Sequence, residues 1–378
     1  MEEGVVLRLT EGRFSTICCT GFSDEIDGGK SPDVGGLCQE QGGLNLMKNK
    51  EWTAGRLMGV SGSYWQACAL HAGVELDVFT LIGADEVSTE EIARRMGGDL
   101  RGVTMLLNAL SAIGLLIKKG QRYSNREESK ALLVKGSPNY VGYMIMHHHH
   151  LVEAWSRLDQ AVQTGKPARK RGARDEKELE SFLMGMFNTA MGIAPNLARE
   201  LDLEGRRHLL DLGGGPGTYA IHFCLANPEL KATVFDLETT RPFARKTVAQ
   251  FGLLERIDFI AGNYLDDDQI DGAYDAVWLS HILHGEGPDA SRMIINKAVS
   301  ALEPGGLLLV HDFILNDSFD GPLFPALFAL NMLVNTEEGR AYSEGEIKGM
   351  LENAGLCDIR RLPFIGPNEA GIVRGLKR

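Results

Sequence analysis

Cysteine is scarce in this sequence, and its spacing points to neither a disulfide framework nor a zinc site. Six cysteines are scattered over 378 residues, and three of them, Cys18, Cys19 and Cys38, lie near the start. No Cys-x-x-Cys or Cys/His spacing appears, so the pattern predicts no metal site. Scattered cysteines are typical of a reducing compartment, and we therefore expect a cytoplasmic protein.

Long apolar runs and a surplus of positive charge are also missing. No segment approaches the roughly 20 apolar residues that cross a bilayer. The first residues, MEEGVVLRLTEGRF, lack the basic region and apolar core of a signal peptide. The chain has 39 Lys and Arg against 51 Asp and Glu, a formal net charge of −12. Because nucleic-acid phosphates must be met by basic side chains, we expect neither nucleic acid nor a membrane as partner.

Residues 1–46 are rich in glycine and polar residues without a sustained period, and we predict that they are disordered. The stretch EQGGLNLM ends at Met47, and a Gly-Gly pair just upstream of a methionine can be the translation of a purine-rich ribosome-binding site. Our hypothesis is that Met47 is the true start and that the tail is not native.

The region from about 55 to 135 has a helical pattern that ends in two short extended segments. Ser88 or Thr89, followed by glutamates, is a capping signal, and LRGVTMLLNALSAIGLL predicts a helix that ends near Gly114. LIKKGQRYSN predicts two strands around a Lys-Gly turn. This order of elements indicates a winged helix. Its recognition-helix position is almost continuously apolar, which favours dimerisation or packing over DNA binding.

Four consecutive histidines, His147–His150, lie inside a predicted helix, GYMIMHHHHLVEAW. Successive helical residues point about 100° apart, so all four cannot converge on one ion. His147 and His150 share a face. We expect one or both to line an acceptor pocket with His281; surface histidines without a role, or a metal ligand pair, are the alternatives.

From about residue 205, strands alternate with helices. The predicted strands include HLLDLGG, KATVFDL, IDFIAGNY, YDAVWLSHIL and LLLVHDFIL, with helical patterns between them. This alternation predicts an α/β fold, a Rossmann-like doubly wound parallel sheet that binds ligands beyond the carboxyl ends of its strands.

A glycine-rich turn follows the first of these strands. Asp211 ends the strand in LLDLGGGPGTYA, and Gly213, Gly215 and Gly217 follow at alternate positions. Glycines let the backbone turn tightly and approach a ligand closely. The next strand ends at Asp236, which can accept hydrogen bonds from both ribose hydroxyls. Together these features indicate S-adenosylmethionine, with further predicted contacts from Leu237, Asn263, Tyr264 and Ser280.

Two histidines, His281 and His284, follow the fourth strand. A hydroxyl acceptor must lose its proton to become a good nucleophile, and a neutral imidazole can take it. His284 is our candidate general base, and Asp312, at the end of the fifth strand, can hold the imidazole in the right tautomer. His281 is either a pocket wall or a packed structural residue. His311 points away from Asp312 by strand alternation and is expected to be structural.

The chain from about 55 to 375 resembles the class I S-adenosylmethionine-dependent O-methyltransferases with an N-terminal winged-helix dimerisation domain, the family of caffeate, acetylserotonin and hydroxyneurosporene O-methyltransferases. The resemblance rests on AGVELDVFTLI, TEEIARRMG, LLNALSAIGLL, FNTAMG, LDLGGGPGTYA, VFDL, AGNY, HILHGEGPDA, LEPGG and GEIKGMLENAGL.

The resemblance implies a homodimer, a small-molecule acceptor and S-adenosylmethionine as cofactor. It divides the chain into a dimerisation domain (47–165), a connector with a pocket-lining helix (166–200) and a catalytic domain (201–378). His284 falls on the family's base and Asp312 on its first orienting acid, while Phe187, Asn188 and Met191 fall on the pocket helix. The chain departs from the family at Gly285 and Asn263, where aspartate is usual, and at Ala341, where a second acid is expected near Glu337 and Glu338.

O-methylation of an aromatic or enolic hydroxyl is the function that these residues favour. The alternatives are C-methylation of a tetrapyrrole or quinone-like ring on the same scaffold, and a catalytically silent dimer that binds S-adenosylmethionine as a regulator.

Overall fold

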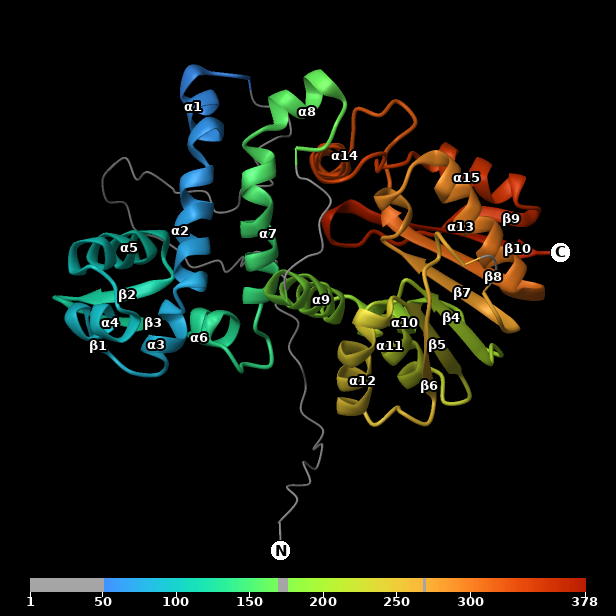
Figure 1. Ribbon diagram of the computed structural model, residues 1–378, viewed down its shortest axis with the longest axis horizontal. Helices are drawn as coiled ribbons and strands as arrows, with labels where there is room; N and C mark the ends of the chain where they lie inside the picture. Colours follow the sequence, from blue (N-terminus) through green and yellow to red (C-terminus); the bar gives the residue numbers. More distant parts are fainter. Residues whose placement is uncertain (1–50, 169–175, 268–269) are drawn as a thin grey trace, which may run out of the picture. The chain divides into compact units, whose positions relative to one another are not determined.

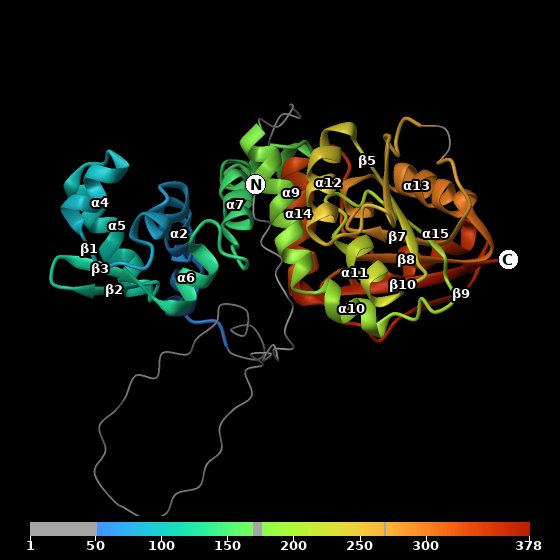
Figure 2. The same ribbon diagram turned by 90° about the horizontal axis from the view of Figure 1, so that it is seen from below.

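The computed structural model describes residues 51–168, 176–267 and 270–378 (Figures 1 and 2). The chain divides into two units, Met1–Met58 and Gly59–Arg378. The described part of the first unit, 51–58, contains the beginning of helix α1 (Ala54–Gly62). The predicted tail, 1–46, and Met47 lie outside the described residues. Within the described part of the chain, no helix is long and apolar enough to cross a membrane.

The second unit begins with helices and a small antiparallel sheet, ordered β1-β3-β2. Ser88 caps the helix that follows it, accepting a hydrogen bond from Glu91 N, and Gly114 ends the long helix with a φ of 92°. The winged-helix prediction is therefore confirmed. The elements are α2 (Tyr64–Glu75), α3 (Val78–Ile82), β1 (Val87–Ser88), α4 (Thr89–Met96), α5 (Leu100–Ile113), β2 (Leu116–Lys119), β3 (Arg122–Asn125) and α6 (Glu127–Leu133).

Helix α5, at the recognition-helix position, buries its apolar side within this unit. Val103, Leu107 and Leu110 are buried in one cluster with residues of α3 and α4. Such burial stabilises the fold by about 1.5–3 kcal/mol for each large apolar side chain. Part of the apolar surface that the sequence predicts for α5 is therefore buried within this unit.

Two long helices connect this region to the large sheet. Helix α7 (Gly142–Trp155), which contains the four histidines, lies beside α9 (Glu176–Met191) in both views (Figures 1 and 2). The short helices α8 (Leu158–Thr164) and α10 (Ala194–Glu200) complete the segment.

The large sheet has seven strands in the order β6-β5-β4-β7-β8-β10-β9. Strands β4 to β8 are parallel, as predicted, while β10 pairs antiparallel with both β8 and β9. This antiparallel edge was not predicted from the sequence. The strands are β4 (His208–Leu212), β5 (Lys231–Asp236), β6 (Ile257–Ala261), β7 (Tyr274–Ser280), β8 (Leu302–Phe313), β9 (Leu356–Arg361) and β10 (Ala370–Lys377).

Helices cover both faces of this sheet (Figure 1). One core cluster joins the sheet to α13 (Pro288–Ala301) and α15 (Glu344–Asn353). The other joins it to α10, α11 (Thr218–Ala226) and α12 (Arg241–Gln250). The order of the strands reverses at β4: β5 and β6 lie on one side of it, and β7 and β8 lie on the other. A doubly wound sheet binds its ligand at such a switch point, at the carboxyl ends of the strands.

Ser343→Ala is expected to lower the free energy of unfolding by about 1 kcal/mol. Ser343 Oγ accepts from Glu346 N, and the Glu346 side chain bonds back to Ser343 N, which forms a capping box at the start of α15. Urea unfolding followed by circular dichroism measures the change. Ser300→Ala, on the exposed side of α13, is the control. An equal change in the free energy of unfolding in the two variants would contradict the role of the cap.

Candidate active site

The glycine-rich turn connects β4 to α11. Gly213, Gly215 and Gly217 have φ values of 69°, 55° and 78°, in the left-handed region that glycine enters readily. A Cβ on Gly213 would collide with Ile282 Cδ1, whereas one on Gly215 would meet no described atom within 4 Å. The turn is thus closed on one side and open at Gly215, where a ligand can approach the backbone. This geometry fits the predicted adenosyl cofactor.

Asp236 ties the end of β5 to this turn. Its Oδ2 accepts a hydrogen bond from Gly215 N at 2.8 Å, and its Oδ1 accepts from Leu237 N at 2.7 Å and Thr240 Oγ1 at 3.1 Å. Burial raises the pKa of Asp236, and the backbone hydrogen bonds from Gly215 and Leu237 oppose that rise. The ends of β4 and β5 therefore bring a carboxylate and an open glycine backbone together.

Asp211 lies beneath the turn. Its side chain is almost fully buried and accepts a hydrogen bond from Ala220 N at 3.2 Å. A Cβ on Gly214 would lie 2.7 Å from Asp211 Oδ2, so this carboxylate also packs against the turn. Burial raises the pKa of Asp211 to about 7. The described contacts of Asp211 support the shape of the turn.

The polar pair after β6 lies at the same edge of the sheet. Asn263 shapes its own loop: its Oδ1 accepts from Leu265 N at 3.0 Å, and its Nδ2 donates to Asp266 Oδ2 at 2.6 Å. A Cβ on Gly213 would lie 3.7 Å from Tyr264 Cε1. Tyr264 is therefore brought to the glycine turn from a third strand.

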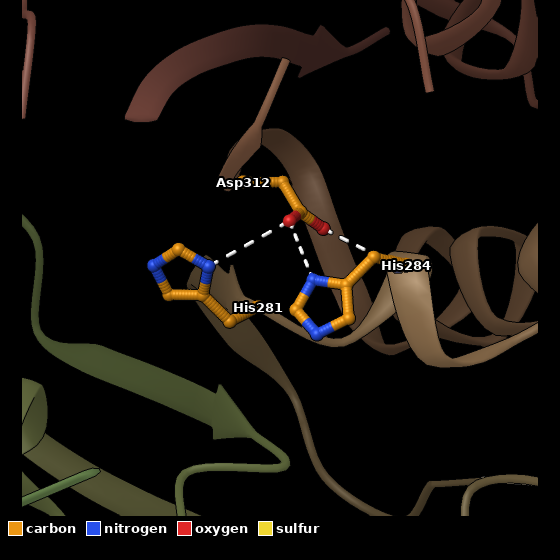
Figure 3. A group of neighbouring side chains, drawn as sticks. All are labelled: His281, His284 and Asp312. Carbon is orange, nitrogen blue, oxygen red and sulfur yellow. Dashed lines mark hydrogen bonds and ion pairs between the residues drawn. The ribbon is translucent and has the colours of Figure 1, made fainter. Parts of the chain in front are cut away.

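His284 and Asp312 form the central pair beyond β7 and β8. His284 lies on the short turn η3 (Leu283–Gly285), and its Nδ1 is 2.6 Å from Asp312 Oδ1 (Figure 3). Asp312 Oδ1 also accepts from Phe313 N at 2.8 Å, and Asp312 Oδ2 lies 3.4 Å from His284 N. Burial alone would raise the pKa of Asp312, but the neighbouring imidazoles, His284 above all, hold it well below its usual range. The carboxylate is therefore ionised and can only accept hydrogen bonds.

His281 faces the same carboxylate from the other side (Figure 3). Its Nδ1 is 3.6 Å from Asp312 Oδ1, which is ion-pair distance but too long for a hydrogen bond. His281 has a φ of 56°, unusual for a residue with a side chain. The structure thus places both predicted histidines beside Asp312.

His311 and Ser280 lie opposite one another on the paired strands β8 and β7. Ser280 Oγ is 2.9 Å from His311 Nδ1, and the buried His311 ring stacks on Trp278. Burial holds the pKa of His311 well below its usual range, so the ring is neutral. This placement supports the structural role expected for His311.

Aromatic side chains surround His284, and they were not predicted from the sequence. Phe328 packs edge-on against the His284 ring at 4.7 Å, and Phe313 lies parallel to it at 6.0 Å. Phe324 joins Phe313 at 4.9 Å. Phe324 and Phe328 belong to α14 (Leu323–Asn335), and the composition of this helix resembles that of any buried helix. Their four-residue spacing, which places both on one face of the helix, was the only signal in the sequence that could have indicated the cluster.

The residues predicted on α7 and α9 have other described neighbours. His147 packs against Phe182 at 5.4 Å, and His150 neighbours His149 at 5.8 Å. Met191 Sδ lies 3.2 Å from His222 Nε2, and Asn188 Nδ2 donates to Tyr140 O. Phe187 is partly buried on the same helix, α9. No described contact joins this set to His281 or His284, so its acceptor-binding role stays a prediction.

The departures from the family pattern leave His284 with one acid. Ala341 is buried, and Glu337 and Glu338 are exposed. A Cβ on Gly287 would collide with Glu338 Oε2, which places that carboxylate beside the Gly287 backbone. A side chain at Gly285 would meet no described atom within 4 Å. Among the described residues, Asp312 supplies the carboxylate that contacts the His284 ring.

Comparisons with known proteins agree with this geometry. Residues 152–357, more than half of the chain, match the model of the O-methyltransferase domain, and residues 58–135 match the model of the O-methyltransferase dimerisation domain.

Similar proteins cover most of this chain. The 3-hydroxy-5-methyl-1-naphthoate 3-O-methyltransferase of Streptomyces sahachiroi is 34% identical, over 83% of this chain and 92% of that protein. The tetracenomycin polyketide synthesis 8-O-methyl transferase TcmO of Streptomyces glaucescens is 32% identical, over 85% and 96%. The solved structure of PigF with SAH (S-adenosylhomocysteine), a Serratia protein, has a TM-score of 0.80 at 25% identity and covers 86% of this chain and all of that one.

The glycine turn tied to Asp236, the His284–Asp312 pair and these relatives lead to one assignment. The chain belongs to the O-methyltransferase family with an N-terminal dimerisation domain, and it is an S-adenosylmethionine-dependent O-methyltransferase.

Proposed function

We propose that the enzyme methylates a hydroxyl of an aromatic small molecule and that His284 is the general base. The observation that carries this proposal is the 2.6 Å contact between His284 Nδ1 and Asp312 Oδ1. Because an ionised carboxylate accepts hydrogen bonds only, the hydrogen of the neutral imidazole lies on Nδ1. His284 Nε2, which faces away from Asp312 in Figure 3, then has a lone pair for a proton.

Proton removal by His284 makes the acceptor oxygen a stronger nucleophile. Asp312 holds the ring during the transfer and stabilises the imidazolium that results. When bound, S-adenosylmethionine supplies an electrophilic methyl group. The protein's remaining task is to place the acceptor oxygen in line with that group.

The aromatic cluster supports a flat, apolar acceptor. Phe313 and Phe328 contact the His284 ring, and Phe324 extends the cluster along α14. Aromatic rings stack favourably with one another, beyond the area that they bury. Two relatives are named for acceptors of this kind, a hydroxynaphthoate and a tetracenomycin polyketide. A hydroxyl on a fused aromatic ring is therefore our proposed acceptor.

The cofactor is proposed to contact Asp211, Gly213, Gly215, Gly217, Asp236, Leu237, Asn263, Tyr264 and Ser280. The acceptor is proposed to contact Phe187, Asn188, Met191, His281 and one or both of His147 and His150. The match to the dimerisation domain supports a homodimer formed through residues 47–165, followed by the connector at 166–200 and the catalytic domain at 201–378. The cytoplasmic location inferred from the cysteines stays a prediction.

Asp236→Asn is expected to weaken S-adenosylmethionine binding by about 10- to 100-fold, because a charged acceptor of ribose hydrogen bonds becomes a neutral amide. Isothermal titration calorimetry measures the dissociation constant. Glu238→Gln, two residues further on and ion-paired with Arg241 on the surface, is the matched control. If the two variants bind S-adenosylmethionine with equal affinity, Asp236 does not contact the cofactor.

His284→Gln is expected to lower kcat by about 10²- to 10⁴-fold while leaving the S-adenosylmethionine dissociation constant unchanged, because only proton transfer is lost. Rates with a hydroxylated naphthoate that the wild type methylates provide the measurement. His208→Gln, at the start of β4, is the control and should retain the wild-type rate. A loss of less than about threefold in His284→Gln would rule out general-base catalysis by this residue.

A further inference from the structure

His281, His284 and Asp312 present three potential metal ligands to one another. One donor atom from each residue lies within 4.8 Å of the other two (Figure 3). The two histidines follow β7, and the aspartate lies near the end of β8. The His-x-x-His spacing is separated from Asp312 by a whole helix, α13, so no local pattern of residues predicts a metal site here.

The His281 ring is held in position, and its Nδ1 has the 3.6 Å contact with Asp312 Oδ1 but no hydrogen bond. His281 N donates to His311 O at 2.8 Å, and the ring packs against His311 and Phe313, each at 4.5 Å. Within the described part of the chain, His281 Nδ1 is buried and has no hydrogen-bond partner. A buried polar atom left without a partner costs about 1–3 kcal/mol. This nitrogen is directed toward Asp312 (Figure 3), and a cation bound between the two side chains would contact it more closely than the carboxylate does at 3.6 Å.

We propose that these three side chains bind one divalent transition-metal ion of the Zn²⁺ class. Imidazole and carboxylate suit Zn²⁺, and three protein ligands leave a fourth position open. Ligand distances of about 2.1 Å separate the donor atoms of a tetrahedral site by about 3.4 Å. His281 Nδ1 and Asp312 Oδ1 are already 3.6 Å apart. His284 Nδ1 is 2.6 Å from that oxygen, about 0.8 Å closer than this spacing, and the three donor atoms lie within 4.8 Å of one another.

Metal binding at this site switches off the base, a consequence that rests on the proposed function of His284. Ligation through Nδ1 occupies the lone pair of that atom, so the proton of the neutral ring moves to Nε2. Nε2 then donates a hydrogen bond and has no lone pair for the acceptor proton. No proton is gained or lost by the neutral ring in this change of tautomer. Zn²⁺ is therefore a reversible inhibitor of methyl transfer.

Zn²⁺ titration of chelator-treated enzyme by calorimetry tests the site. The four histidines of α7 could bind Zn²⁺ on their own, so the parent protein carries His147→Gln, His148→Gln, His149→Gln and His150→Gln. His281→Asn removes one ligand, and asparagine tolerates the positive φ of this position. We expect at least tenfold weaker Zn²⁺ binding for His281→Asn, and unchanged binding for His208→Gln. Equal affinities in the parent and His281→Asn would overturn the site.

Rates with and without Zn²⁺ then separate the two proposals. In the parent, Zn²⁺ should suppress methyl transfer and a chelator should restore it, while His281→Asn, compared with its own metal-free rate, should need at least tenfold more Zn²⁺. Zn²⁺ could instead bind tightly through His281 and either leave methyl transfer unchanged or activate it. This result would overturn the inhibition by Zn²⁺ and count against His284 as base. The metal site itself would stand. Zn²⁺ binding independent of His281, together with a large rate loss in His284→Gln, would overturn the metal site and leave the base intact.

Discussion

The hydrogen bond between His284 and Asp312 depends on how two parallel strands pair. In the β7–β8 register, Ser280 lies opposite His311. The next residues along the two strands, His281 and Asp312, therefore come together beyond the end of β7, and His284 follows on the short turn η3. A slip of one residue would turn Asp312 to the other face, where His311 lies against Trp278. The buried residues of β7 and β8, Trp278 and Leu309 among them, hold this register and therefore the geometry of the site.

A second set of hydrogen bonds holds the glycine turn on the cofactor side of the same sheet edge. Asp236 accepts the Gly215 N–H across the ends of β4 and β5, and Asp211 supports the turn from below. Ile282, next to His281, fills the space that a side chain at Gly213 would need. The glycine turn is thus packed against Ile282, which lies between His281 and the η3 turn that contains His284.

Local patterns predicted much of this arrangement. The capped helix at Ser88, the Lys-Gly turn between β2 and β3, and the five parallel strands follow from periodicity and turn residues. The antiparallel insertion of β10 between β8 and β9 was not predicted, because pairing between distant segments leaves no local signal. Similarly, Phe328 beside His284 depends on the packing of α14. The orientation of His147 and His150 depends on the helices beside α7, where His149 meets His71 on α2.

We infer that His284 and Asp312 act as one unit in proton removal. The most direct test is a double-mutant cycle on kcat with His284→Gln, Asp312→Asn and the double variant, each checked for fold and S-adenosylmethionine affinity. Our account predicts that the double variant is no slower than His284→Gln alone, within about threefold, because Asp312 acts through the imidazole. Losses that multiply across the two sites would show that the residues act independently and would contradict it.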